Sequence, residues 1–265
     1  VTDGYNAGHG LPFDSDGMKE RYPGVFFSQF TGAELVAEKW NLSREDLDEF
    51  ALESHQKAAN ATESKYFDRE ILPVEGKNAE GINELVLADE GIRFDASLDK
   101  LAGLKPVTDG GVITAGNASQ ITDGAAAVMI CNDAGLKKIQ SNPRAEIVSI
   151  SVVGDDPVFM LTGPIPASKK ALEAAGLSID DMDLYEVNEA FAPVPLAWAH
   201  DLEADKSKLN VNGGAMALGH PLGATGAKLM TTMLHELERR NGNYALQAIC
   251  EGGGTANATI IKRLS

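Results

Sequence analysis

The sequence predicts an α/β fold in which helices and strands form stacked layers. Three observations predict it. After about residue 120, short apolar strands alternate with helical segments; the last two strands form a hairpin; and the composition is that of a globular protein. With 265 residues, of which 43% are hydrophobic and 23% charged, the chain can bury a core and is neither disordered nor collagen-like. The length suggests one large domain or two modest ones.

The first half is expected to consist largely of loops with two helices. Residues 1–30 show no clear period. Thr31 starts a capping-box pattern for a helix to about Trp40, and Ser43 starts a longer helix to about residue 64. The remaining elements expected before residue 112 are short strands at 67–74 and 84–87 and a helical turn at 98–101.

The second half is expected to hold the buried sheet. Residues 124–131 and 145–153 are apolar runs typical of strands buried on both faces. A helix over 166–175 ends at Gly176, whose position is that of a helix C-cap. The elements that follow are a strand at 183–187, a helix from about 189, a long helix over 222–240, and strands at 244–250 and 256–262.

Charge and cysteine content exclude several classes of protein. The net charge of −16 repels polyphosphate backbones, so we expect no nucleic-acid partner, although a few basic side chains can still hold a small anionic ligand. Two cysteines give no disulfide framework and predict a reducing, cytoplasmic location. No apolar run reaches the roughly 18 residues that span a bilayer, so we expect no membrane partner. The first residue is not Met and no signal peptide follows, which suggests the middle of a longer chain.

Asn188 begins the first of three motifs that lie near strand ends. The motif Asn-Glu-Ala-Phe-Ala over 188–192 directly follows an apolar strand, where α/β folds place chemistry. The Asn188 amide can hold a water or a substrate oxygen. The alternative is structural: Asn188 caps a helix, and Glu189 favours its positive end.

His220 belongs to the second motif, a segment over 210–226 with five glycines. Glycines let the backbone come close to a ligand. With Pro221 in a first helical turn, His220 is expected at the positive end of a helix, which disfavours the imidazolium and leaves a neutral ring able to donate to an oxyanion. The alternative is a buried histidine held by backbone partners.

Cys250 begins the third motif, Cys-Glu-Gly-Gly-Gly. A thiol at a strand end beside exposed backbone amides can act as a proton donor, whereas the common alternative is a buried, inert cysteine. Cys131 fits the inert alternative, because it ends an apolar strand and no glycine loop follows. The histidines show no metal-ligand spacing, so no metal site is predicted.

Together, the three motifs resemble the C-terminal signature blocks of the thiolases in residues, order and spacing. Residues 114–119, Thr-Ala-Gly-Asn-Ala-Ser, are similar to the pantetheine-binding loop of that family. The resemblance implies a layered αβαβα architecture. It divides the chain into a loop domain for CoA binding and oligomerisation (1–120), the end of the N-terminal half (121–140) and a C-terminal βαβαβαββ half (141–265).

The resemblance also implies an activity and a role for each site residue. Thiolases split 3-oxoacyl-CoA with CoA, as in fatty-acid β-oxidation, or condense acyl-CoAs in reverse. Coenzyme A is thus a substrate, and no cofactor is bound permanently. The implied catalytic residues are His220 with a water on Asn188 as one oxyanion hole, Cys250 as acid and base, and the Gly252 N–H in a second hole. The implied CoA contacts are Ser119, Ala115, Arg93, Ala190 and Phe191.

Two departures from the family pattern affect this interpretation. Nothing in the chain matches the N-terminal cysteine that carries the acyl group, so we expect the 265 residues alone to be inactive. Residues 28–31, Ser-Gln-Phe-Thr, replace a Met-Gly of many short-chain members and leave the acyl preference open. One alternative is a catalytically inactive CoA-binding or assembly subunit. Another is a ketosynthase of the same superfamily, against which Cys250 argues. The family resemblance also suggests a homotetramer built as a dimer of dimers.

Overall fold

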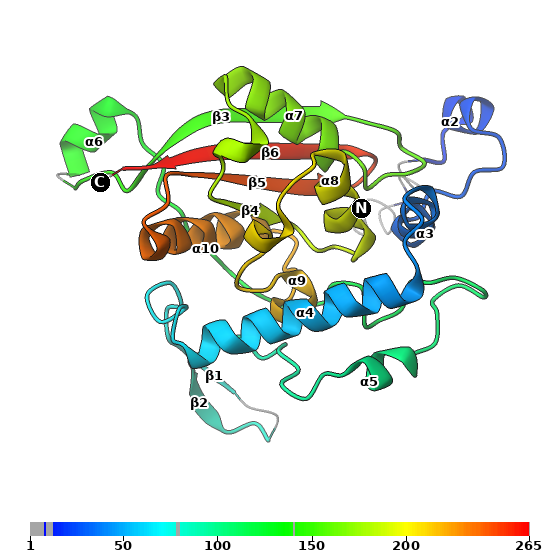
Figure 1. Ribbon diagram of the computed structural model, residues 1–265, viewed down its shortest axis with the longest axis horizontal. Helices are drawn as coiled ribbons and strands as arrows, with labels where there is room; N and C mark the ends of the chain where they lie inside the picture. The colour runs from blue at the N-terminus through cyan, green and yellow to red at the C-terminus, as the bar shows by residue number, and fades with distance from the viewer. Residues whose placement is uncertain (1–7, 9–12, 78–79, 140, 265) are drawn as a thin grey trace.

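The computed structural model describes residues 8, 13–77, 80–139 and 141–264. Its centre is a four-stranded sheet with the order β3-β6-β5-β4 (Figure 1). The strands are β3 (Ala145–Gly154), β4 (Leu184–Val187), β5 (Tyr244–Glu251) and β6 (Thr255–Arg263). β4 and β5 run parallel, and the other two pairs are antiparallel. The hairpin of β5 and β6 and the α/β fold are as predicted.

Helices cover both faces of this sheet. α7 (Pro164–Ala175) packs on β3 and β6, and α10 (Thr225–Arg240) packs on the opposite face against β4 and β5 (Figure 1). Gly176 has a φ of 65° and ends α7 as predicted. The remaining helices of this half are α8 (Pro193–Asp201), α9 (Ala215–Leu218) and the short 3-10 helices η1 (Ile179–Asp181) and η2 (Lys206–Lys208).

The first half of the chain packs beside these layers rather than within them. α4 (Arg44–Glu63) contacts α9, and α3 (Gln29–Lys39) contacts α8. α4 follows Ser43, where a helix was predicted to start, and it begins with a capping box in which Ser43 and Asp46 each accept from the backbone N–H of the other. The smaller elements are α2 (Asp16–Arg21), the hairpin of β1 (Val74–Lys77) and β2 (Asn83–Val86), α5 (Leu98–Ala102) and α6 (Asp133–Ile139).

Several predicted element boundaries are wrong. α3 is capped by Ser28, whose Oγ accepts from the Phe30 N–H, so the helix starts before the predicted capping box at Thr31. α2 lies where a loop was expected, and residues 1–7 and 9–12 of that loop fall outside the described residues. Residues 67–73 form turns and loop, and the strand begins only at Val74. The βαβαβαββ pattern implied a further strand between α8 and α10. The described residues show only an isolated parallel bridge there, between Tyr185 and Leu209.

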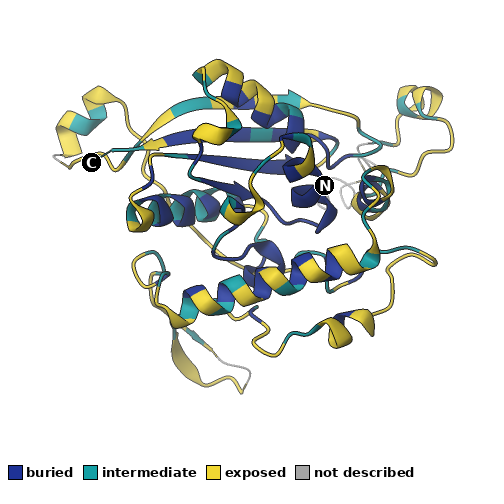
Figure 2. Cartoon of the chain, viewed as in Figure 1, coloured by how far each residue is buried: buried dark blue, intermediate teal, exposed yellow. Residues whose placement is uncertain are grey.

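The largest correction concerns residues 124–131, which were predicted to form a buried strand. They form no strand, and their side chains are exposed (Figure 2). Met129 is 78% exposed and Ile130 72%, and Cys131 is exposed as well. No strand in the described part of the chain pairs with this segment, so its apolar side chains are left largely exposed. We call residues 124–131 the exposed apolar segment.

β3 was also predicted to be buried on both faces, and it is an edge strand instead. It pairs with β6 on one side and with no described strand on the other. Ile150 is 60% exposed and Val152 63%, because α7 covers only one face of β3. No helix of the described residues is long and apolar enough to cross a membrane.

Candidate active site

The three motifs meet at the carboxyl ends of the parallel strands β4 and β5. Asn188 directly follows β4, and its N–H donates to the Ala248 carbonyl of β5 at 3.0 Å. Cys250 lies two residues further along β5, so the parallel pairing of β4 and β5 brings the Asn188 and Cys250 segments together. His220 reaches the same place from the loop after α9. His220 and Cys250 line one cavity of about 890 Å³, together with Ala190 and Gly252.

Asn188 does not cap a helix, because α8 begins only at Pro193 with Ala192 as its N-cap. The side chain is instead 1% exposed, and its Nδ2 lies 3.2 Å from His220 Nε2. Its Oδ1 is buried and has no partner in the described chain. A buried carbonyl oxygen without a partner is costly, so this oxygen is an acceptor available for a water or a ligand.

His220 is held on its other ring nitrogen by Thr225, whose Oγ1 lies 2.6 Å from Nδ1. The Thr225 hydroxyl also lies 3.0 Å from the Pro221 carbonyl. When the hydroxyl donates to that carbonyl it accepts from Nδ1–H, and Nε2 is a base. When the hydroxyl rotates to donate to Nδ1, Nε2–H becomes a donor. The Thr225 contact is thus compatible with both neutral tautomers. The Asn188 Nδ2 group at Nε2 is a donor and pairs only with an unprotonated Nε2, so the amide must turn away when Nε2 carries the proton.

Burial lowers the pKa of His220 and keeps the ring neutral. The predicted cause, a helix N-terminus, is wrong. Residues 221–224 form a turn, and α10 begins at Thr225, so Pro221 does not lie in the first turn of the helix.

Cys250 is 8% exposed, and burial raises the pKa of its thiol to about 12. A thiol with this pKa stays protonated at neutral pH and is suited to donating a proton rather than to persisting as a thiolate. Beyond it, Gly253 and Gly254 have φ values of 80° and 79°, which form the tight turn between β5 and β6. Nothing lies within 4 Å of the position that a Cβ would take on Gly252, so the space beside it is open.

Glu189 holds two motifs together, a role that the sequence did not indicate. Its buried carboxylate accepts from Ser54 Oγ (2.7 Å), Asn210 Nδ2 (2.9 Å) and the Met216 N–H (3.2 Å). A Cβ on Gly214 would lie 2.2 Å from the Glu189 carboxyl carbon. The turn after β4 therefore packs directly against the loop that leads to α9. The predicted role of Glu189 at the start of a helix is wrong, because α8 begins four residues later.

The predicted pantetheine loop lies next to this turn. The Ser119 N–H donates to the Ala190 carbonyl at 3.0 Å, and Ala118 forms a β-bridge with Phe191. Ala190 lines the cavity, whereas Ala115 is exposed at the outer end of the loop. Phe191 does not line the cavity: it is 4% exposed and packs edge-on against Phe30, which does.

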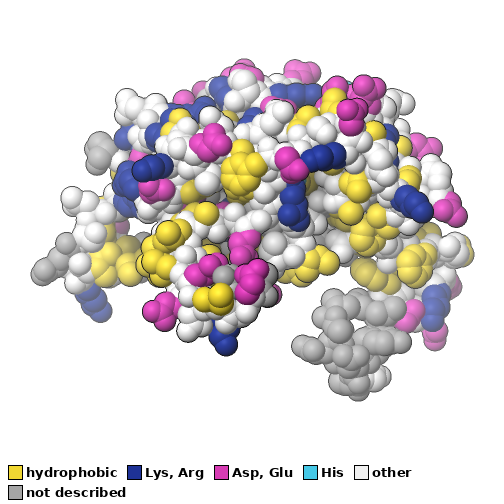
Figure 3. Space-filling model, turned by 90° about the horizontal axis from the view of Figure 1, so that it is seen from below, with side chains coloured by type: hydrophobic (Ala, Val, Ile, Leu, Met, Phe, Trp, Pro, Cys, Tyr) yellow, Lys and Arg dark blue, Asp and Glu magenta, His cyan; other side chains and the backbone are white. Residues whose placement is uncertain are grey.

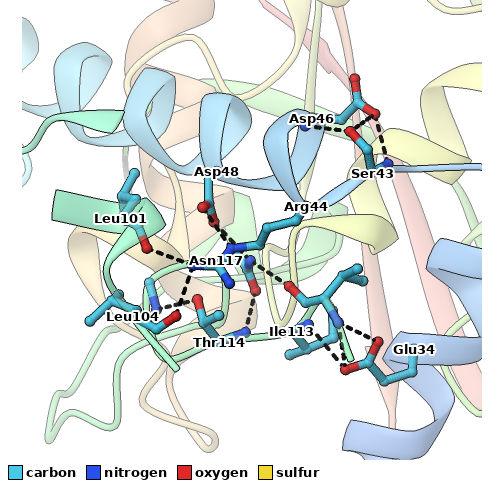
Figure 4. Close-up of polar contacts among 12 residues, drawn as sticks. Glu34, Ser43, Arg44, Asp46, Asp48, Leu101, Leu104, Ile113, Thr114 and Asn117 are labelled. Atoms are coloured by element: carbon cyan, nitrogen blue, oxygen red, sulfur yellow. Dashed lines mark hydrogen bonds and ion pairs between the residues drawn. The ribbon is translucent and has the colours of Figure 1, made fainter. Parts of the chain in front are cut away.

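A buried polar network supports that loop (Figure 4). Asp48 of α4 accepts from Arg44 Nε at 2.6 Å and from Asn117 Nδ2 at 2.9 Å. Asn117 Oδ1 accepts from the Thr114 N–H at 2.8 Å. Glu34 of α3 accepts from the backbone N–H groups of Val112 and Ile113. Helices α3 and α4 thus fix the path of residues 112–117 from outside the sheet.

Arg93 lies outside the cavity formed by His220 and Cys250. Its side chain is exposed, and its backbone N–H donates to the Nδ1 of buried His55 at 3.1 Å. Burial, together with the nearby Arg93 charge, lowers the pKa of His55. Lys and Arg side chains occur among acidic ones on the face seen in Figure 3, so basic groups remain available despite the net charge of −16.

Two further sequence features concern a metal site and Cys131. Among the described residues, no group of three or more His, Cys, Asp or Glu side chains is placed to hold a metal ion. Cys131 was predicted to be buried and is exposed, because the strand predicted to contain it does not form.

Comparison with family models and known proteins gives one consistent result. Residues 14–134 match the model described as thiolase, N-terminal domain, and residues 141–263 match the model described as thiolase, C-terminal domain. A steroid 3-ketoacyl-CoA thiolase of Mycobacterium tuberculosis is 55% identical over 92% of this chain and 58% of its own length. The human mitochondrial 3-ketoacyl-CoA thiolase is 47% identical over 87% of this chain and 58% of its own.

The solved structures agree with the sequences. A crystal structure of the human mitochondrial enzyme superposes with a TM-score of 0.85 at 46% identity, covering 89% of this chain and 59% of that one. The same enzyme in complex with CoA gives 0.82 at 45% identity, over 88% of this chain and 58% of that one. The chain thus spans a little under three-fifths of the length of these relatives.

Proposed function

Because this chain belongs to the thiolase family, we propose that it takes part in acyl transfer on coenzyme A. The reaction is the cleavage of a 3-oxoacyl-CoA by CoA, or the reverse condensation of two acyl-CoAs. The observation that carries the proposal is the convergence of Asn188, His220 and Cys250 at one end of the parallel strands.

His220 and Asn188 would bind the thioester oxygen. In the tautomer with a proton on Nε2, His220 donates to the oxygen as negative charge develops on it, and a water held by the unpartnered Asn188 Oδ1 supplies the second donor. The low pKa of His220 supports this role, because a neutral ring needs no counter-ion in a buried site.

Cys250 would move the proton. In cleavage, the thiolate of the acyl carrier adds to C3, the bond between C2 and C3 breaks with its electron pair going to C2, and C2 takes the proton from Cys250 Sγ. This leaves acetyl-CoA and an acyl thioester on the carrier. The thiol of the incoming CoA then gives its proton to the Cys250 thiolate, and the CoA sulfur takes the acyl group from the carrier. The backbone N–H of Gly252, beside open space, is assigned to the second oxyanion hole.

Binding of CoA is assigned to a strip that leads away from these residues. Ser119 and Ala115 contact pantetheine, Ala190 and Phe191 stand beside the thioester, and Arg93 meets the anionic nucleotide end. The hydrogen bond from Ser119 to Ala190 supports this order, because it joins the loop to the cavity wall. The cytoplasmic location, the homotetramer and the division at residues 120 and 140 stay predictions.

The acyl group is proposed to be larger than acetyl. Four phenylalanines line the cavity, namely Phe13, Phe26, Phe27 and Phe30, and a 55% identical relative is named for steroid substrates. A ring-bearing 3-oxoacyl-CoA should therefore give a higher kcat/KM than acetoacetyl-CoA, and the opposite ranking would contradict a bulky acyl group.

The acylated nucleophile is proposed to lie outside these 265 residues. Cys250 is buried, with a pKa of about 12, and Cys131 lies on the exposed apolar segment, away from the cavity. Two-step acyl transfer needs a covalent carrier, so the chain alone should not turn over. The same observation favours a second candidate, a CoA-binding subunit without activity of its own.

The role of His220 is tested by replacing it in an active protein that contains this chain. His220→Ala should lower turnover by about a hundredfold, as loss of an oxyanion donor does, while CoA still binds. His200→Ala is the matched control, because His200 is 74% exposed at its side chain and lies outside the cavity. Near-normal turnover of His220→Ala would return this residue to a structural role.

The carrier is tested on the 265-residue chain itself. After incubation with acetyl-CoA, the intact mass should show no acetyl adduct. An adduct on Cys250, released again when CoA is added, would show that Cys250 is the nucleophile and that the roles above are wrong.

A further inference from the structure

We propose that Gln120 is a positioning residue that joins the Arg93 loop to the segment that carries His220. A single amide then sets both CoA binding and the geometry of the oxyanion histidine. The inference rests on the proposed function only for the roles of His220 and Arg93. The junction itself is described by contacts of Gln120.

The Gln120 side chain contacts two separate segments, the loop that contains Gly91 and helix α9. Its Nε2 donates to the Gly91 carbonyl at 2.7 Å and to the Met216 carbonyl at 2.7 Å, and lies 3.3 Å from the Ala217 carbonyl. An amide nitrogen has two N–H groups, so both of its protons are used at this junction.

The Gln120 backbone makes the connection to His220 direct. Its carbonyl accepts from the His220 N–H at 3.1 Å, and its own N–H lies 3.4 Å from the Ala215 carbonyl. The residue before it, Ser119, is bonded to Ala190 in the same way. Residues 119 and 120 therefore run between the turn after β4 and the loop that ends at His220.

The junction is closely packed around Gly91. A Cβ on Gly91 would lie 2.7 Å from the Ala217 carbonyl oxygen and 3.1 Å from both terminal atoms of the Gln120 side chain. Only glycine allows this approach, and its φ is not in the left-handed region, so space alone decides the residue.

The Arg93 loop and the segment that carries His220 are each held by further contacts besides those to Gln120. The Arg93 N–H is held by His55, the Gly91 carbonyl by Gln120, and Ile92 between them is buried in a small apolar cluster. On the other side, His220 is held at Nδ1 by Thr225 and at its backbone by Gln120. Removal of the Gln120 amide leaves each loop with one anchor fewer.

Neither glutamate nor asparagine can make the same contacts as Gln120 at this junction. An ionised glutamate has no N–H and would face three carbonyl oxygens. Asparagine carries the same amide on a shorter stem and cannot reach both loops. The position thus selects for the length and the donor pair of glutamine.

The test compares Gln120→Ala with Gln56→Ala in the 265-residue chain. Gln56 is an exposed glutamine of α4 and serves as the matched control. Two readouts are needed: the affinity for CoA by calorimetry, and the imidazole signals of His220 by NMR of histidine-labelled protein, assigned with His220→Gln. Gln120→Ala should weaken CoA binding about tenfold and shift the His220 signals, while Gln56→Ala changes neither.

Gly91→Ala approaches the junction from the opposite side. Its added methyl group crowds the same amide and the Ala217 carbonyl while residue 120 remains glutamine, so it should give the same pair of changes. Gln120→Asn should fall between wild type and Gln120→Ala. These two variants carry the test if Gln120→Ala does not fold.

Several outcomes would overturn the proposal. Unchanged CoA affinity and unchanged His220 signals would do so, as would a change at one site only. Unfolding of all three variants while Gln56→Ala folds would make Gln120 purely structural. If wild type does not bind CoA, the proposed function fails, but the His220 signals still decide whether Gln120 positions that ring.

Discussion

Residues 124–131 and 245–250 are both short apolar runs that end at a cysteine. The second run forms most of β5, with β4 and β6 hydrogen-bonded on either side and helices on both faces. The first is the exposed apolar segment, which no described strand accompanies. An apolar run shows that a segment can be buried, but whether it is buried depends on the strands and helices that pack against it.

The same difference separates the chemistry of the two cysteines. Cys250 is desolvated by its neighbours in the sheet, which raises its pKa to about 12, whereas Cys131 is exposed. Burial within the sheet thus keeps the Cys250 thiol protonated at neutral pH. Four predictions test this difference between the two runs.

The largest expected effect is on thiol reactivity. A thiol with a pKa of about 12 is ionised to about one part in ten thousand at pH 8, and Cys250 is also shielded. Iodoacetamide should therefore modify Cys131 at least about a thousandfold faster than Cys250, measured by peptide mass spectrometry over time. Cys131→Ala should leave the chain resistant, and fast labelling of that variant would contradict the assigned burial.

The second effect is on stability and uses two alanines. Ala248 of β5 is fully buried, and Ala126 of the exposed apolar segment is exposed. Ala248→Asp should lower the free energy of unfolding by at least about 3 kcal/mol, because it buries a polar group without a partner. Ala126→Asp should change it by less than about 0.5 kcal/mol. Equal effects in urea unfolding would mean that the two runs share one environment.

The third effect concerns a charge inside the sheet. Glu186 of β4 pairs in register with Gln247 of β5, and neither Glu186 oxygen has a partner among the described residues. Burial raises the Glu186 pKa well above its usual range. The unfolded carboxyl ionises near pH 4.3, so the stability contributed by the protonated form is present below that pH and is lost as pH rises toward the folded pKa.

Glu186→Gln removes this pH-dependent cost. The variant should be more stable than wild type by about 2 kcal/mol at pH 8 and about equal at pH 4. Thermal unfolding at both pH values measures the difference. A gain that is the same at both would show that shape, rather than ionisation, is responsible.

The smallest effect on stability is expected for Ile130, whose side chain is already exposed to solvent. Ile130→Thr removes an exposed side chain and should change the free energy of unfolding by less than about 0.5 kcal/mol. It should nevertheless reduce self-association in light scattering, because it interrupts an apolar run. A loss of more than about 1 kcal/mol would show that Ile130 packs against something.

Sequence alone predicted those parts of the fold that local chemistry determines. A helix starts after Ser43, and Gly176 ends α7 with a left-handed φ, both as predicted. The hairpin of β5 and β6 also follows from its own residues. The exposed apolar segment could not be predicted, because its pattern is that of a strand and its fate depends on neighbours distant in the chain.

The motifs predicted the residues of the candidate site but not the side chains that hold those residues in place. The motifs identified the residues that meet, Asn188, His220 and Cys250. They gave no sign of Ser54 or Gln120, since those side chains contribute through partners far away in sequence. Thr225 lies within the second motif, but the motif did not indicate its contact with His220. The one signal available was a polar residue on the apolar face of α4, which is Ser54.

The contact between Glu189 and Gly214 also constrains how the sequence can change over time. No side chain fits at Gly214 while Glu189 stays in place, and removal of Glu189 leaves three donors unpaired. A substitution at either position alone is therefore expected to destabilise the site. The two positions are 25 apart in the sequence and in direct contact in the structure, so they have to change together.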